Sequence, residues 1–245
     1  MKPLTFTLKK LPTNQLDCRQ LTPNLLSGLS IEKISSIFIT KNKQAHDYFD
    51  ITGDNTQQII FKNTYHCLDY IGHKMANGQI IIEGDCGDFL GANMQGGSII
   101  CNGNAGDRVG DQMRRGLVLI DGNSGDYLAS RMLAGTIGVY GRVGKYAGFA
   151  MKRGTILLRR QFDTNDKCNT LLDATLDATL DATLNATFHA TMQDCGTHNL
   201  PFLALLFQSF KPLPTKFNQI KSNRAQRFAG DLANNGNGEI LVISA

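Results

Sequence analysis

The chain has 245 residues, a formal net charge of +4 at pH 7 and a hydrophobic fraction of 42%, which is enough for one large domain with a substantial core. The weak positive charge does not favour a nucleic-acid-binding protein, because such proteins concentrate Lys and Arg far more strongly. The longest apolar stretch, residues 200–210, is too short to span a bilayer and the N-terminus lacks the apolar region of a signal peptide, so we expect a cytoplasmic protein that does not bind membranes.

The first segment, residues 1–64, contains no internal repeat. SIFITKN at residues 36–42 predicts a strand, and AHDYFDITGD at residues 45–54 predicts a connector with a turn. We interpret the segment as an N-terminal cap over one end of the repeats that follow, since an uncovered sheet edge promotes aggregation.

Residues 65–160 repeat every nineteen residues without a gap. Each repeat combines a short apolar run with several glycines, which cost a helix ~1 kcal/mol each. Nineteen extended residues instead provide ~60 Å of chain, enough for one closed turn of a β-solenoid. We therefore predict a mainly β fold, a right-handed parallel β-helix whose coils stack ~4.8 Å apart.

Residues at the same place in successive repeats form columns. We expect the Met column that begins at Met75 and the aliphatic column that begins at Ile71 to point inward as a continuous core. An aromatic column from Tyr70 to Tyr146 should stack as a ladder, with Arg108 joining it through cation–π contacts. Cys67 and Cys86 share a column and are predicted to be small buried thiols, with a disulfide as the alternative.

The glycines are predicted to be corner residues that need positive φ or close backbone approach. An Asp next to each corner is expected to bond its own backbone. The corner glycines are Gly84, Gly87, Gly91, Gly103, Gly106, Gly110, Gly122, Gly125, Gly141, Gly144 and Gly148, and Ala129 replaces one member of the third column.

Two segments follow the repeats. In residues 161–191 the tetrad TLDA recurs almost perfectly, which is typical of a low-complexity insertion with no function of its own. Residues 192–245 form a C-terminal extension, in which LPFLALLFQSF predicts a buried helix and the last residues predict a glycine-rich turn and a final strand.

No motif in the sequence indicates a catalytic, cofactor or metal site. GDCGDFLG at residues 84–91 resembles a phosphate loop, but no GKS or GKT exists and the same pattern recurs in the following repeats. The six cysteines form no CxxC pair and the five histidines form no HxH or HExxH pattern. We expect no catalytic residue, no bound cofactor and no metal on this chain.

One group of basic residues could bind a partner. Arg114 and Arg115 occupy the same two columns as Lys152 and Arg153, and Arg131 lies in a nearby column. We call these five residues the basic strip. It is either a solvated edge or a docking surface for an acidic partner or an anionic ligand tail.

The spacing GxxGxxxGxxMxxG, repeated with Ile- and Val-rich runs, resembles the GXGXG β-helix domain. That domain closes the large subunit of glutamate synthase, and it makes up one whole chain of formylmethanofuran dehydrogenase, here called the β-helical subunit. The rows IIIEGDCGDFLGANMQGG and GLVLIDGNSGDYLASRMLAG look like its core, and DCGTHNLPFLALL and GDLANNGNGEILV look like its C-terminal region. The resemblance covers roughly residues 30–160 and 188–243.

The resemblance implies a non-catalytic scaffold. It is greatest to the β-helical subunit of the bacterial formyltransferase/hydrolase complex, which converts formyl-tetrahydromethanopterin to formate through a methanofuran-type carrier. The implied partners are an amidohydrolase-like chain, a formyltransferase chain and a third chain, which together would hold the reaction sites. The alternative is the β-helical subunit of a tungsten or molybdenum formylmethanofuran dehydrogenase, and the identity of the third chain would separate the two. The extra C-terminal region argues against a glutamate-synthase-like accessory domain, and the period of nineteen argues against a hexapeptide acyltransferase.

Overall fold

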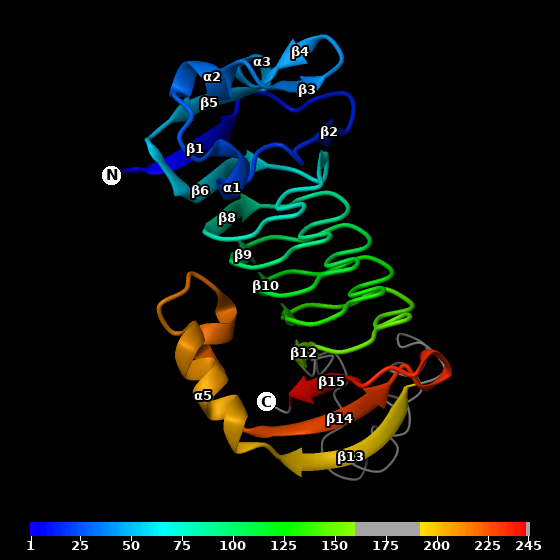
Figure 1. Ribbon diagram of the computed structural model, residues 1–245. Coiled ribbons are helices and arrows are strands. Elements are labelled where there is room, and N and C mark those ends of the chain that lie inside the picture. The colour runs from blue at the N-terminus through cyan, green and yellow to red at the C-terminus, as the bar shows by residue number, and fades with distance from the viewer. Residues whose placement is uncertain (160–191, 244–245) are drawn as a thin grey trace, which may run out of the picture.

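A computed structural model describes residues 1–159 and 192–243 of the chain. The protein is mainly β, and its largest element is a mixed sheet of eleven strands in the order β13-β14-β15-β12-β11-β10-β9-β8-β6-β1-β5. Figure 1 shows this sheet as one wall of a stack of coils, with the N-terminal elements at one end and β13, β14 and β15 at the other.

The N-terminal segment combines short strands with single helical turns. Its elements are β1 (Pro3–Leu8), β2 (Leu16–Asp17), α1 (Pro23–Leu26), α2 (Ile31–Ser35), β3 (Phe38–Thr40), β4 (Lys43–Gln44), α3 (Ala45–Tyr48), β5 (Phe49–Thr52) and β6 (Asn55–Thr64). The predicted strand at residues 36–42 is present as β3. The stretch expected to be only a connector holds α3 and β5, and its turn follows at Gly53 with φ +89°.

The main sheet already begins before the nineteen-residue period does. Strand β6 pairs in parallel with β1 on one side and with β8 on the other, with Ile59 opposite Ile80. Residues before position 65 therefore do more than cover an end, because three of their strands, β6, β1 and β5, extend the main sheet.

Five short strands come from the apolar runs of the repeats. They are β8 (Gln79–Gly84), β9 (Ser98–Cys101), β10 (Leu117–Ile120), β11 (Thr136–Val139) and β12 (Thr155–Arg159). Each pairs in parallel with the next, so that Ile80, Ile99 and Val118 lie side by side at a spacing of nineteen residues. A further short strand, β7 (Leu68–Asp69), pairs with β2 on the opposite wall.

The C-terminal extension returns to the same sheet. It contains β13 (Gln193–Asn199), α5 (Pro201–Phe210), the 3₁₀ turn η1 (Lys216–Gln219), β14 (Arg224–Gly230), η2 (Leu232–Asn234) and β15 (Gly238–Ile243). The predicted final strand is β15, which pairs in parallel with β12 as if it were a further repeat. Strands β14 and β13 then add to β15 in antiparallel order.

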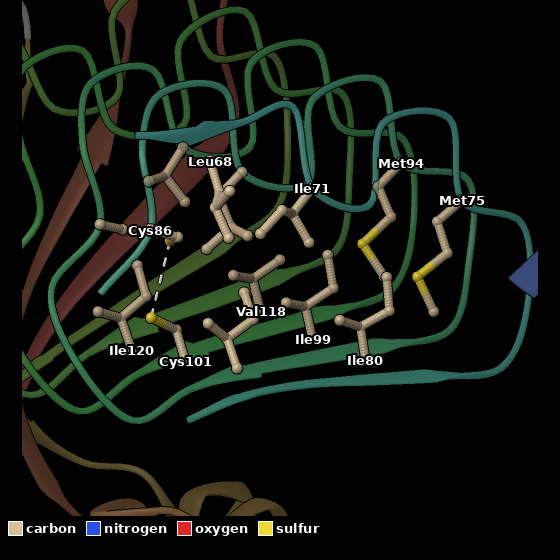
Figure 2. Close-up of a cluster of buried hydrophobic side chains, with 14 of the residues drawn as sticks. Leu68, Ile71, Met75, Ile80, Cys86, Met94, Ile99, Cys101, Val118 and Ile120 are labelled. Carbon is tan, nitrogen blue, oxygen red and sulfur yellow. Dashed lines mark hydrogen bonds between the residues drawn. The ribbon is translucent and has the colours of Figure 1, made fainter. Parts of the chain in front are cut away.

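The main core lies between the strand wall and the turns that face it. Figure 2 shows Ile71, Met75 and Met94 pointing from the turns toward Ile80 and Ile99 on the strands. The predicted Met and aliphatic columns are confirmed as core, since all of their side chains are at most 1% exposed. A second core lies on the outer face of the sheet, where α5 and η1 pack over Leu119 and Leu157.

The predicted aromatic column is confirmed. Tyr70 and Phe89 stack with ring centroids 4.6 Å apart, and Tyr127 and Tyr146 stack at 5.0 Å. Arg108 fills the gap between the pairs, with its Cζ 4.7 Å from the Tyr127 ring. Arg19, from the N-terminal segment, covers the free face of Tyr70 at 4.4 Å and so extends the column.

This column adopts the left-handed conformation, which the sequence reasoning had assigned to glycine and Asp. The five residues Tyr70, Phe89, Arg108, Tyr127 and Tyr146 have φ between 58° and 63°. Non-glycine residues in this region carry a strain of ~1–3 kcal/mol each. Stacking of the large side chains offsets this strain. Ala129, which stands in a glycine column, also takes a positive φ of 57°.

The prediction that the corner Asp residues bond their own backbone is wrong. Each carboxylate instead accepts the backbone N–H nineteen residues later: Asp88 Oδ1 from Asp107 at 2.8 Å and Asp107 Oδ1 from Asp126 at 2.8 Å. A Cβ on Gly106 or Gly125 would overlap the same carboxylate oxygens. Glycine is therefore required there because the acceptor of the preceding repeat occupies the space of its side chain.

A second ladder runs parallel to the first and was not predicted. Asp85 Oδ1 accepts the N–H of Asn104, Asn104 Oδ1 that of Asn123, and Asn123 Oδ1 that of Arg142, at 2.7 to 2.9 Å. We call the two columns together the acceptor ladders. They hydrogen-bond the turns of successive repeats where no regular strand is present.

Replacing Asp107 by Ala should lower the free energy of unfolding by about 1–2 kcal/mol, because the N–H of Asp126 loses its acceptor. Asp107→Asn is the matched control, since its amide oxygen can accept the same hydrogen bond. Its free energy of unfolding should fall clearly less than that of Asp107→Ala. Urea unfolding followed by circular dichroism measures both. Equal losses for the two variants would show that charge, rather than the acceptor atom, matters at this position.

Candidate surfaces for partners and ligands

The basic strip divides into free and engaged residues. Arg114, Arg115 and Arg153 are exposed, and within residues 1–159 and 192–243 their guanidinium groups have no hydrogen-bond or ion-pair partner. Leu133 and Ala134 separate the first two from Arg153, because they occupy the intervening repeat. The strip is thus two patches of charge in the same columns rather than a continuous row.

Arg131, which is itself exposed, covers a buried polar pair formed by Asp111 and Ser130. Its guanidinium forms a bidentate ion pair with Asp111, with Nη2–Oδ2 at 2.8 Å, and the Asp111 side chain is only 4% exposed. Ser130 Oγ donates a 2.5 Å hydrogen bond to the same carboxylate. Arg131 therefore neutralises a buried carboxylate while its own side chain stays 50% exposed, and its docking role stays a prediction.

Lys152 is also engaged, since its Nζ donates to the carbonyl of Asn234. This contact ties the last repeat to the loop before β15. Of the five predicted docking residues, the structure thus leaves Arg114, Arg115 and Arg153 as the exposed and unpaired ones, and their docking role stays a prediction.

The described histidines do not converge. His73 packs edge-on against Tyr70 with ring centroids 5.7 Å apart, and burial lowers its pKa below the ordinary value, with Arg19 and Lys74 lowering it further. His46 lies 3.7 Å from Asp47, and His198 bonds the carbonyl of Cys195 at 2.7 Å. In the part of the chain that the structure describes, no group of three or more His, Cys, Asp or Glu side chains could hold a metal ion.

The described cysteines are free thiols, as the preferred interpretation of Cys67 and Cys86 predicted. Cys86 has a neighbour that the sequence did not reveal: its Sγ lies 3.7 Å from that of Cys101, on the strand wall (Figure 2). The hydrogen bond to Cys101 and burial raise the pKa of Cys86 well above its ordinary value. Burial also raises the pKa of Cys18. Cys195, on β13, is exposed.

The C-terminal extension presents an apolar surface. The prediction of a buried helix is only half right, because α5 buries Leu203, Phe207 and Phe210 while Phe202 is 44% and Leu205 76% exposed. We call Phe202, Leu205 and the adjoining Pro201 and Ala204 the α5 outer face. The nearly unbroken apolar run of the sequence was the available signal, since an amphipathic surface helix would carry polar residues there.

Strand β13, next to α5, is exposed along its whole length and lies at the edge of the sheet. Such an edge is a template for pairing with another chain unless something covers it. The α5 outer face directly follows the β13 edge in the sequence, and the two elements are neighbours in the C-terminal extension (Figure 1).

Two hollows lie outside the core. One of about 620 Å³ is lined by the residues 10–16 and the β3–β4 hairpin, including Lys10, Lys41 and Lys43. The other, of about 330 Å³, lies between the end of the strand wall and residues 219–222. No helix among the described residues is long and apolar enough to cross a membrane.

Comparison with known proteins finds a similar solved structure. No family model matches the chain, and a search of curated proteins finds no similar sequence. Among solved structures, the chain is similar to one chain of the formyltransferase/hydrolase complex (FhcABCD) from Methylorubrum extorquens in complex with methylofuran, with 27% identity, a TM-score of 0.59, and coverage of 97% of this chain and 98% of that chain. The similarity relates this protein to one component of an enzyme complex over nearly its full length.

In the native protein, iodoacetamide should alkylate Cys195 much faster than Cys18, Cys86 or Cys101, because the first thiol is exposed and the others are at most 2% exposed. Peptide mass spectrometry after timed labelling measures this, with protein unfolded in urea as the control in which all four should react. Native labelling of Cys86 or Cys101 as fast as that of Cys195 would contradict the closed core.

Proposed function

We propose that the chain is the β-helical subunit of a formyltransferase/hydrolase complex, in which it has a structural role. The observation that carries the proposal is the end-to-end match, 97% of one chain against 98% of the other at 27% identity, to a chain of such a complex. A shared domain within unrelated proteins would not align both termini. The sequence resemblance to the β-helical subunit, which includes the C-terminal extension, supports the same assignment.

As part of this proposal, the nineteen-residue stack is a right-handed parallel β-helix of the GXGXG type. The parallel register at a spacing of nineteen, the glycines that accommodate the acceptor ladders and the inward Met column all support it. The interior of the stack is filled with side chains, so that its surfaces rather than its interior are available for function.

We further propose the division of labour in the complex. The complex transfers a formyl group from tetrahydromethanopterin to a methanofuran-type carrier and releases formate, with these steps on an amidohydrolase-like chain, a formyltransferase chain and a third partner chain. This chain holds no cofactor of its own in the proposal, and it is placed in the cytoplasm. Its contribution is a rigid wall that keeps the partners in place.

The α5 outer face fits another chain of that complex. Leu205, at 76% exposed, and Phe202, at 44%, would be left in water in an isolated chain, whereas apolar and aromatic side chains are enriched at the centres of permanent interfaces. The free arginines of the basic strip are the second proposed contact, for an acidic region of a partner or of the carrier.

Affinity purification of the tagged full-length chain from its native cell should recover three partner chains, one amidohydrolase-like and one formyltransferase-like. The intact assembly should release formate from formyl-tetrahydromethanopterin, and the chain alone should show no formyl transfer or hydrolysis. If the third partner carries residues that bind molybdenum or tungsten and iron–sulfur clusters, the complex is the dehydrogenase alternative and the proposal is wrong. Turnover by the chain alone would refute the structural role.

Leu205→Asp should reduce recovery of the partners at least about tenfold, because a charge would be buried in the interface. Leu25→Asp is the matched control: Leu25 is a 53% exposed leucine on α1 in the N-terminal segment, away from α5, and its variant should leave recovery unchanged. Joint replacement of Arg114, Arg115 and Arg153 by Ala tests the basic strip in the same assay. Normal recovery and normal turnover of the triple variant would leave the strip as a solvated edge.

A further inference from the structure

The smaller hollow is built by a segment that crosses the outer face of the strand wall. Just past the ends of the strands, Asn102 and Asp121 stand in one column and hold this segment: Asn102 Nδ2 donates to the carbonyl of Pro214 at 2.7 Å. Asp121 Oδ1 accepts from Thr215 Oγ1 at 2.6 Å and from the N–H of Lys216 at 2.8 Å. Asp121 is only 5% exposed, so the segment is anchored by a buried carboxylate.

The next two residues of the same column are Tyr140 and Arg159, and they line the hollow. Opposite them lie Lys221 and Ser222, and Ile220 and Ile243 form the apolar walls. The volume of about 330 Å³ is at the lower end of the range for small-molecule sites. The hollow therefore combines fixed walls with a size suited to one small acid or one side chain.

Among the described residues that line the hollow, the charged side chains are those of Arg159 and Lys221, which are both positive. Arg159 Cζ lies 4.4 Å from the Tyr140 ring, and Lys216 Nζ lies 5.6 Å from the same ring. Within the described residues, Arg159 and Lys221 have no ion pair and no side-chain hydrogen bond. No Asp or Glu of the described chain lines the hollow.

Asp121, in the same column as Tyr140 and Arg159, and Glu239, on β15, pair with other residues. The carboxylate of Asp121 is used by Thr215, Lys216 and Asn102. Glu239 pairs with Arg227 at 3.1 Å and accepts from Thr155. In the part of the chain that the structure describes, no carboxylate pairs with Arg159 or Lys221, so that both can bind an anionic ligand.

We propose that this hollow binds a ligand carboxylate, supplied by an acidic peptide segment or by a small organic acid. Stacking on Tyr140 orients the Arg159 guanidinium, whose planar fork matches a carboxylate in bidentate geometry. Lys221 adds a second charge, while Ile220 and Ile243 suit the methylene carbons next to a carboxylate. This proposal rests on the hollow alone and does not depend on the proposed function.

The test uses the full-length chain and two probes, a fluorescein-labelled tri-glutamate peptide followed by polarisation, and glutarate as an unlabelled competitor. Uncharged glutaramide and inorganic phosphate are the comparison compounds. We expect the peptide to bind and glutaramide to have no effect. If glutarate competes at low millimolar concentration, a small organic acid is sufficient to fill the hollow. If the peptide binds and glutarate does not compete, the ligand is an acidic peptide segment. Stronger competition by phosphate than by glutarate would overturn the assignment to a carboxylate.

Arg159→Gln and Lys221→Gln should each weaken peptide binding by about tenfold, the effect of removing one charge-assisted hydrogen bond. Arg159→Lys keeps the positive charge but loses the planar guanidinium. Its affinity for the peptide should fall between those of wild type and Arg159→Gln. Lys33→Gln, at an exposed lysine on α2 outside both the hollow and the basic strip, is the control for non-specific attraction. The proposal fails if the peptide does not bind, if Arg159→Gln and Lys221→Gln bind as wild type does, or if Lys33→Gln weakens binding equally. Lys221 is exposed, so its variant keeps the test valid should Arg159→Gln be unstable.

Discussion

The structure depends on one interaction between repeats: a side-chain oxygen of each repeat accepts a backbone N–H of the next. Asp88, Asp107 and Asp126 make one such ladder and Asp85, Asn104 and Asn123 the other. The turns have little strand pairing, so these acceptors satisfy backbone donors that would otherwise lack partners. The acceptor atom stands where a side chain of the following glycine would be, which couples each Asp or Asn to a glycine in the next repeat. A regular spacing of nineteen residues is the consequence.

The same turns store strain that stacking offsets. An aromatic or Arg residue with left-handed φ would be unfavourable in an isolated turn, but the repeat places five of them in one column. Their rings and the Arg108 guanidinium then contact one another along the stack. Arg19 covers the end at Tyr70. The N-terminal segment therefore contributes to the repeats both through its strands and through this contact.

The filled interior leaves function to the outside of the stack. The C-terminal extension continues the sheet through β15 and builds a second core with α5 and η1. Two unusual surfaces involve this extension: the apolar α5 outer face, and the cationic hollow that residues 219–222 form with Tyr140 and Arg159 of the repeats. The first suits a protein partner and the second a carboxylate. The repeats supply a rigid frame for them.

The sequence predicts the fold and the surfaces of the repeats better than those of the C-terminal extension. The period, the strands, the Met core and the aromatic column were predictable, because in a repeat every residue meets its equivalents nineteen positions away and local pattern becomes three-dimensional contact. The direction of the corner Asp side chains was not predictable from the sequence. An Asp beside a turn can accept a hydrogen bond from its own backbone or from the next repeat, and the stacking of the repeats decides between the two. The TLDA prediction lies outside the described residues. The pairing of Arg131 with the buried Asp111, the neighbouring thiols of Cys86 and Cys101 and the placing of residues 219–222 against Tyr140 and Arg159 were decided by tertiary structure alone, because each joins residues whose separation in the chain is not the repeat.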